Sequence, residues 1–263
     1  MKRLYQIEYT KIRTYRAFWI LFGLYILFMI LAMVGFDGFI NATMDDTPTV
    51  GGMAFTPRIN QFPDIWQYLT YIAGYFHYIL GVLVIILATN EFSYKTIRQS
   101  VINGQSRGEF LMGKVLMIIA FALVATLVVF LTVMILGLLN TDNLDGEKMF
   151  RKVAFLPAFF IQCIGFSMLA LLISLLVKRA GFAIGILLLY GFVAEKIAVY
   201  YIPEPFHLYM PVEAMDNLIQ LPIMQIVGND VPPLPTLRET LLTVGYSVGF
   251  GALCYWLMKR RDL

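Results

Sequence analysis

Residues 115–141 read VLMIIAFALVATLVVFLTVMILGLLNT and contain no Asp, Glu, Lys or Arg. As an α-helix this run would be about 40 Å long, which is enough to cross a hydrocarbon layer of about 30 Å. Lipid offers the backbone no hydrogen-bond partners, so a crossing run of this length has to satisfy its own amides as a helix. Strands of a membrane barrel would be about half as long and would alternate in polarity. The stretch therefore predicts a membrane-spanning helix.

Five more runs have the same character. The chain of 263 residues is 59% hydrophobic and 14% charged, with a mean hydropathy of +0.74, which is too apolar for an ordinary soluble domain. The fifth run is long enough to cross only if it continues through Glu195 and Lys196. We predict an all-α polytopic membrane protein in which residues 1–263 form one transmembrane domain. The six predicted spans are residues 17–36, 66–89, 115–139, 154–177, 180–201 and 240–258.

The basic residues are unevenly divided between the two sides of such a six-span protein. Both chain ends and every second loop fall on one side, which collects 14 of the 20 Lys and Arg residues but only 4 of the 17 Asp and Glu residues. Because basic segments resist translocation, this side is expected to be cytoplasmic. We predict cytoplasmic N- and C-termini and a place in the inner (cytoplasmic) membrane. The net charge of +3 then reflects topology and contact with anionic lipid, and it does not indicate nucleic-acid binding.

The first 16 residues can be interpreted in two ways. Plotted as a helix, four apolar or aromatic side chains share one arc, and Glu8 interrupts it. The four are Leu4, Tyr5, Ile12 and Tyr15. We predict an interfacial helix over residues 1–16 that lies on the inner membrane surface. The alternative is a basic tail that only sets the topology.

The loop between the second and third spans, residues 90–113, is the most informative polar stretch. Tyr94, Ile97 and Val101 have helical spacing, which predicts a short amphipathic helix that presents Lys95 and Arg98 away from the membrane. Asn103-Gly104 is a turn signal, and Ser106-x-x-Glu109 has the form of a capping box at the start of the next helix. The loop is thus predicted to be a cytoplasmic helix–turn–helix against which a partner could push.

This loop resembles the cytoplasmic segment of type 2 ATP-binding-cassette (ABC) exporter permeases. The matching residues are Glu91-Phe92, Thr96-Ile97-Arg98, Ser106-Arg107 and Gly113-Lys114. The six spans, the basic N-terminal segment and the long outer loop before the last span are similar as well. The resemblance implies a coupling helix docked on a separate cytoplasmic ATPase, and a second permease chain, identical or related, around a translocation path. It assigns coupling to Glu91, Tyr94, Lys95, Thr96, Arg98 and Arg107.

A partial phosphate-binding motif lies in the same region. Gly108-x-x-x-x-Gly113-Lys114 matches the start of a P-loop, but Val115 follows where Ser or Thr is needed to reach Mg²⁺. The intervening residues favour a helix, and no predicted strand precedes them. We therefore predict no cofactor site and no catalytic or metal site in this chain, with ATP-Mg bound by a partner subunit.

The outer segment, residues 202–237, contains seven prolines and cannot be one continuous helix. Val212, Met215 and Ile219 share a helical face, so short helices could dip into the outer leaflet as re-entrant segments. The resemblance implies that this region closes the exit of the path; the alternative is an ordinary surface loop. Glu195 lies in the outer part of the bilayer or in its headgroup zone. The candidate pathway or outer-gate residues are Glu195, Met215 and Ile219.

Three functions fit the sequence unequally. The first is the permease subunit of an ABC exporter, which moves a substrate by alternating access driven by separate ATPase subunits. The second is a secondary transporter or channel, which usually needs charged groups near the bilayer midplane, whereas five of the six spans carry no formal charge. The third, an intramembrane enzyme, lacks paired acids, a Ser/His pair or a metal-ligand cluster within the spans. The sequence does not identify the substrate.

Overall fold

The computed structural model describes residues 10, 12–13, 15–44, 49–50, 53–54, 60–94, 106–142, 145–203, 206–220 and 233–260. Apart from helices and turns, the described residues contain one short antiparallel pair of strands, β1 (Thr49–Val50) with β2 (Met53–Ala54). The α-helices are α2 (Arg16–Met44), α3 (Ile65–Gly74), α4 (His77–Ser93), α6 (Arg107–Asn140), α7 (Gly146–Phe150), α8 (Phe155–Val177), α9 (Ala180–Leu189), α10 (Glu195–Tyr201), α11 (Pro211–Asp216) and α12 (Leu237–Arg260). A π-helix, η1 (Tyr190–Ala194), joins α9 to α10, and a 3₁₀ turn, η2 (Phe206–Tyr209), precedes α11.

All six predicted spans form helical segments that are long and apolar enough to cross a membrane. The segments are Arg16–Ala42, Ile65–Ser93, Arg107–Asn140, Gly146–Val177, Ala180–Tyr201 and Leu237–Arg260. The predicted all-α polytopic fold is thereby confirmed. Most of the predicted N-terminal interfacial helix lies outside the described residues. Ile12, which is described, is buried in the apolar cluster that also contains Phe18 and Phe22 of α2.

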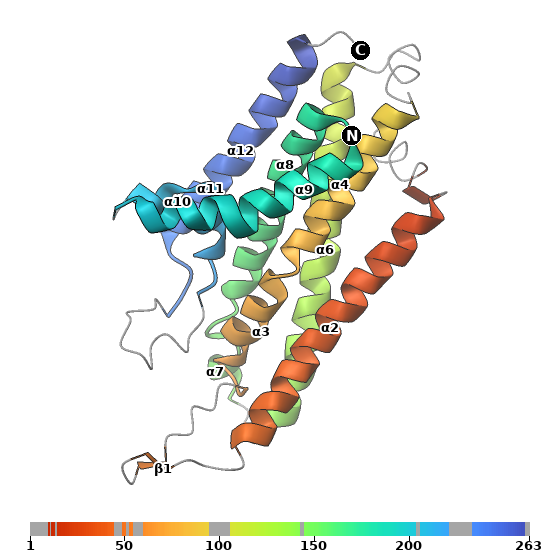
Figure 1. The fold of residues 1–263 in the computed structure, drawn as a ribbon. Helices are drawn as coiled ribbons and strands as arrows, with labels where there is room; N and C mark the ends of the chain where they lie inside the picture. Colours follow the sequence, from red (N-terminus) through yellow and green to blue (C-terminus); the bar gives the residue numbers. More distant parts are fainter. Residues whose placement is uncertain are drawn as a thin grey trace.

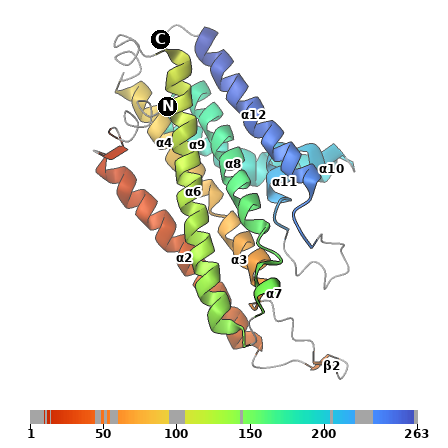
Figure 2. The same ribbon diagram turned by 180° about the vertical axis from the view of Figure 1, so that it is seen from behind.

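Helix α8 is the centre of the bundle (Figures 1 and 2). It packs against α3, α4, α6, α9, α11 and α12. Its sequence is apolar on every side, as expected for a helix surrounded by other helices. About two thirds of the most apolar part of the α7–α8 span is buried, compared with 17% for the α12 span and 22% for the α9–α10 span. The last two spans therefore lie at the periphery, where their apolar faces are available to lipid.

The two ends of the bundle differ in chemistry. We call one of them the basic end; it is formed by the end of α4, the start of α6, the junction of α8 with α9 and the end of α12 (Figure 1). The opposite end, which we call the far end, is formed by the end of α2, the start of α3, the end of α6, and α7.

Helix α6 has 34 residues and is about 50 Å long at 1.5 Å per residue, well beyond a hydrocarbon layer of about 30 Å. It is therefore longer than the hydrocarbon layer that it would cross.

The second span is divided rather than continuous. Helix α3 ends at Gly74 and α4 begins at His77, with Tyr75 and Phe76 in a turn between them. Gly74 lies against the Gln162 side chain of α8, since a Cβ atom there would be 3.2 Å from its Oε1 atom. A glycine in contact with an inserted polar side chain is a common cause of a helix break.

The fifth span crosses the bundle obliquely, whereas the other long helices run more nearly along it (Figures 1 and 2). The π-helical turn η1 lies in the middle of this span, between α9 and α10. The span ends beside α11, and this group lies partway along the bundle rather than level with the far end (Figure 1). α-Helices that contain a π-helical turn often carry functional residues at that point.

We expect Gly137→Ala in α6 to destabilise the protein, because a Cβ atom there would overlap the Phe62 ring. The ring has to move, at a cost of about 1–3 kcal/mol. The measurement is the thermal unfolding midpoint of the purified protein in detergent. Gly23→Ala is the matched control, because no atom lies within 4 Å of its added methyl group. Equal midpoints for the two variants would contradict the close contact.

Candidate functional site: the frame at the basic end

The predicted coupling segment is held between helices whose ends are described. Residues 95–105 lie outside the described part of the chain, so Lys95, Thr96 and Arg98 have no structural assignment. On either side of the segment, α4 ends at Ser93 and α6 begins at Arg107. Tyr94 is 72% exposed at the end of α4. The described residues therefore show what anchors this segment on each side.

The start of α6 has the predicted capping box. The Ser106 hydroxyl accepts a hydrogen bond from the Glu109 backbone N–H at 3.1 Å. The Glu109 carboxylate accepts one from the Ser106 backbone N–H at 2.8 Å. Both otherwise unpaired amides at this helix start are satisfied, which fixes where the helix begins. The prediction from Ser106-x-x-Glu109 is confirmed.

An ion pair joins α4 to α6 just inside the basic end. The Lys114 ammonium donates to the Glu91 carboxylate, and the two side chains are 2% and 10% exposed. The ammonium also lies 5.4 Å from the centre of the Phe110 ring. A buried ion pair of this kind costs desolvation but penalises any arrangement that separates the charges. The end of α4 and the first turns of α6 are thus held together.

Arg107 joins the start of α6 to the end of α12. Its Nη1 atom donates to the Met258 carbonyl at 2.8 Å and to the Lys259 carbonyl at 2.9 Å. These carbonyls belong to the last turn of α12, where helix carbonyls lack partners within the helix and the dipole favours a positive charge. The guanidinium group therefore caps α12 from a neighbouring helix.

The end of α8 completes the frame. Lys178 adopts a left-handed conformation with φ of 58°, and its N–H donates to the Ser174 carbonyl at 2.9 Å, which closes the helix. Its ammonium lies 5.5 Å from the centre of the Phe92 ring at the end of α4. The ends of α4, α8 and α12 and the start of α6 are thus linked to one another. We call these linked helix ends the frame.

The frame contains two of the predicted coupling residues in specific contacts, Glu91 and Arg107. Sequence reasoning assigned no role to Lys114, although a lysine just before a charge-free run of 27 residues is a signal for a buried partner. It also missed that Arg107 reaches α12, because the two positions are 151 residues apart in sequence.

We expect Arg107→Gln to loosen the last turn of α12, because the neutral, shorter side chain cannot donate to both carbonyls. Hydrogen bonds from a charged group are worth about 1.5–3 kcal/mol. Amide hydrogen exchange at residues 256–260 should become faster. Arg179→Gln is the control, since Arg179 is exposed at the same end and makes no side-chain cap bond to α9. Unchanged exchange in Arg107→Gln would contradict the capping role.

The three candidate gate residues are separated into two places. Glu195 is 1% exposed, and its carboxylate accepts a hydrogen bond from the Glu213 N–H of α11 at 2.7 Å. Met215 is fully buried beside Gly165 of α8, where a Cβ atom on the glycine would lie 3.1 Å from the methionine methyl group. Ile219 lies beyond the end of α11 and packs in a different apolar cluster from Met215. Of the three residues, only Met215, which belongs to α11, and Glu195, which binds its backbone, therefore lie at α11.

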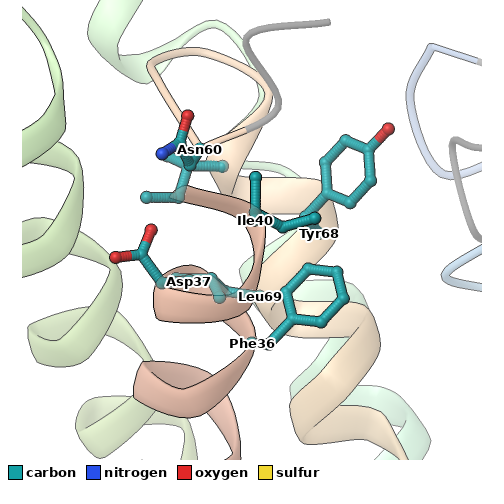
Figure 3. Close-up of a pocket in the computed structure, with 7 residues that line it drawn as sticks. Phe36, Asp37, Ile40, Asn60, Tyr68 and Leu69 are labelled. Atoms are coloured by element: carbon teal, nitrogen blue, oxygen red, sulfur yellow. The ribbon is translucent and has the colours of Figure 1, made fainter. Parts of the chain in front are cut away.

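A small pocket near the far end contains a polar group that sequence reasoning missed (Figure 3). Asp37 points toward α6 and away from the Phe36 and Tyr68 rings. Its carboxylate accepts from Asn140 of α6 at 2.7 Å and from Asn41 at 3.3 Å. The Asn140 bond ties the end of α2 to the end of α6, and the Asn41 bond lies within α2. Among the described residues, no group of three or more His, Cys, Asp or Glu side chains could hold a metal ion.

Comparison with known families gives a match over almost the whole chain. The family model described as ABC-2 family transporter protein matches residues 3–263. A search among curated proteins found no match to the sequence. The match includes all six apolar spans and the loop that flanks the frame. The chain therefore belongs to the ABC-2 family of transporter proteins and is a multi-pass membrane permease.

Proposed function

We propose that this chain is the transmembrane permease subunit of an ATP-driven exporter, and that a separate cytoplasmic ATPase acts on it through residues 90–113. The observation that carries the proposal is the frame, which ties the helices on both sides of the coupling segment to each other and to α12. A push on the segment would reach α4, α6 and α12 together. ATP-Mg would bind to the partner, and this chain would supply the path.

The contacts of the second span support a lever. At the far end, Trp66 of α3 donates to the Met149 carbonyl of α7 at 2.7 Å, and Gln67 donates to the Gln220 carbonyl at 3.0 Å. Lys152 also binds Asp64 just before α3 at 2.7 Å. The turn between α3 and α4 separates this anchored half from the half that carries the frame. Movement of α4 about the turn would convert closure of the ATPase into a change between two states of the path.

The secondary-transporter alternative has less support. Among the described residues, the buried charged side chains are Asp37, Glu91, Lys114 and Glu195. Asp37, Glu91 and Lys114 lie toward the ends of their apolar segments, and the Glu195 carboxylate, nearer the middle of the fifth, accepts the Glu213 N–H of α11 at 2.7 Å. Transporters coupled to an ion gradient usually hold the ion near the bilayer midplane. We therefore place the energy source on a partner subunit.

The proposal includes an assembly and a location. We infer two permease chains, identical or related, with two ATPase subunits at the cytoplasmic side of the inner membrane. The basic end would face the cytoplasm, in agreement with the distribution of Lys and Arg residues.

Purification from the native membrane in mild detergent tests this proposal. A tag on the permease should retain a polypeptide with nucleotide-binding motifs, and the isolated complex should hydrolyse ATP. The same purification after Arg107→Gln and Lys114→Met should retain less of this subunit. Recovery of the permease without an ATPase, in a form that moves solute in response to an ion gradient alone, would contradict the proposal.

A further inference from the structure

We propose that Tyr78 is a positioning residue that links α4 to the fifth span, so that movement of α4 about the break in the second span also moves α10 and α11. The use of this link by an ATPase rests on the proposed exporter function. The link itself consists of contacts within this chain and does not depend on ATP.

Tyr78 lies at the end of α4 that is farthest from the frame. It belongs to the first turn of α4, directly after the break between α3 and α4. The same helix continues to Ser93 and carries Glu91 and Phe92 of the frame near its other end. Glu91 is 13 positions after Tyr78, so about 20 Å of continuous helix joins the two residues. A rigid helix of this kind can carry a displacement from one end to the other.

The Tyr78 ring is enclosed by two aromatic rings and a glycine. It stacks on Phe192 of η1 with the ring centres 4.2 Å apart, and it meets the edge of Phe166 of α8 at 4.6 Å. A Cβ atom on Gly191 of η1 would lie 2.6 Å from a ring carbon of Tyr78. The side chain is buried, with 6% of the residue exposed. We call the space between Phe166, Gly191 and Phe192 the Tyr78 seat.

The packing around the seat leaves α4 little freedom to slide past the fifth span. One turn after Tyr78, Gly81 repeats the close approach, because a Cβ atom there would lie 3.0 Å from the Phe166 ring and 3.1 Å from Leu187 of α9. Closely packed interiors transmit a displacement to their neighbours because they contain no free space to absorb it. If α4 turns about the break, the Tyr78 ring therefore presses on η1.

The fifth span is in turn attached to α11. Helix α10 follows η1 without interruption. The Lys196 ammonium of α10 lies 2.9 Å from a Glu213 oxygen and 3.1 Å from an Asp216 oxygen. One residue earlier, the Glu195 carboxylate accepts the Glu213 backbone N–H at 2.7 Å. Two consecutive residues of α10 thus bind both the side chains and the backbone of α11, so α11 should follow α10.

The apolar side chains in this region connect the same elements. Tyr78 of α4, Leu187 of α9 and Met215 of α11 belong to one buried cluster. Helix α9 packs against both α4 and α8 as the fifth span crosses them (Figures 1 and 2). The Tyr78 seat therefore lies where the half of the second span that carries the frame meets the span that holds α11. Through it, a displacement at the frame would reach Met215, a candidate gate residue.

Thiol accessibility in the full-length protein in lipid nanodiscs tests this link. Met215→Cys places a thiol at a fully buried position of α11, and Cys163 and Cys254 are replaced by alanine. Glu91→Gln/Lys114→Met then removes the ion pair that holds the other end of α4. The rate of reaction with a polar maleimide is measured with and without this release, in the absence of ATP and of any ATPase. Release should raise the rate about three- to tenfold.

Substitution of Tyr78 distinguishes a link from ordinary packing. In Tyr78→Ala the released and intact proteins should react at equal rates, whereas Tyr78→Phe keeps the ring in its seat and should keep the difference. A residue that only fills space would change both rates by the same factor. Leu80→Ala is the matched control, because Leu80 is fully buried in the same helix but packs in the other apolar cluster. It should leave the effect of release unchanged.

Gly191→Ala tests the other side of the contact and serves if Tyr78→Ala fails to fold. The added methyl group should displace the ring and reduce the effect of release, whereas Gly185→Ala, with no atom within 4 Å of its methyl group, should not. The link would be overturned if release left the rate unchanged, if Tyr78→Ala kept the full difference, or if Leu80→Ala abolished it as well. Because no ATPase takes part, failure of the exporter proposal would leave these results unchanged.

Discussion

Lys114→Met should reduce the free energy of unfolding by about 3–5 kcal/mol, the largest stability effect expected in this protein. The substitution keeps a long apolar side chain but removes the ammonium from a position that is 2% exposed. The Glu91 carboxylate, which is 10% exposed, then loses the Lys114 ammonium that offsets part of its desolvation. The measurement is the denaturant-induced unfolding of the purified protein in detergent, compared with the wild-type chain.

The double variant Glu91→Gln/Lys114→Met is the control for this prediction. It removes both charges, so it should recover most of the lost stability. ATP-dependent activity should not recover to the same extent, because the link between α4 and α6 is still absent. If the single and double variants were equally unstable, the loss would come from packing and not from the broken Glu91–Lys114 ion pair.

Arg98→Ala should lower transport-coupled ATP hydrolysis by about tenfold or more while leaving the unfolding midpoint unchanged. The residue belongs to the predicted coupling helix, in the Thr96-Ile97-Arg98 sequence that resembles ABC exporter permeases. Loss of the guanidinium would remove a contact with the ATPase and would keep the Glu91–Lys114, Arg107–α12 and Lys178–Phe92 contacts that define the frame. The measurement is ATP hydrolysis by the purified complex in nanodiscs.

Arg151→Ala is the matched control for Arg98→Ala, because Arg151 is exposed between α7 and α8 at the other end of the bundle. It should hydrolyse ATP at the wild-type rate. A normal rate in Arg98→Ala, or an equal loss in Arg151→Ala, would count against coupling through this segment.

The spans and one helix start were predictable because they depend on local sequence. A run such as residues 115–141 can satisfy its backbone in lipid only as a helix, whatever its neighbours are. The capping box at Ser106 and Glu109 is equally local, since both of its hydrogen bonds join residues three positions apart. Such features follow from the amino-acid sequence without knowledge of the packing.

The break in the second span and the oblique course of the fifth could not be predicted in the same way. At the break Gln162 of α8 lies against Gly74, a contact between residues 88 positions apart that the sequence does not reveal. The oblique course of α9 and α10 depends on packing against α4, α8 and α11. Apolar periodicity is uninformative here, because α8 and α9 are apolar on all sides.

The candidate site was predicted in part. The family resemblance pointed to residues 90–113, and the structure adds the side chains that link the flanks of this segment to other helices. Lys196 illustrates what was missed. The sequence analysis gave Lys196 no partner, and its actual partners, Glu213 and Asp216, lie 17 and 20 positions further on.

Site-specific photo-crosslinking from Tyr94 tests the central claim most directly. Tyr94 is 72% exposed where α4 leads into the coupling segment, so a photoreactive phenylalanine analogue at this position should capture the ATPase subunit in native membranes. The same analogue at Tyr200, 83% exposed at the end of α10, should not capture it. Capture of an ATP-binding-cassette subunit from Tyr94 alone is the result that the account predicts. Capture from Tyr200 and not from Tyr94 would contradict it.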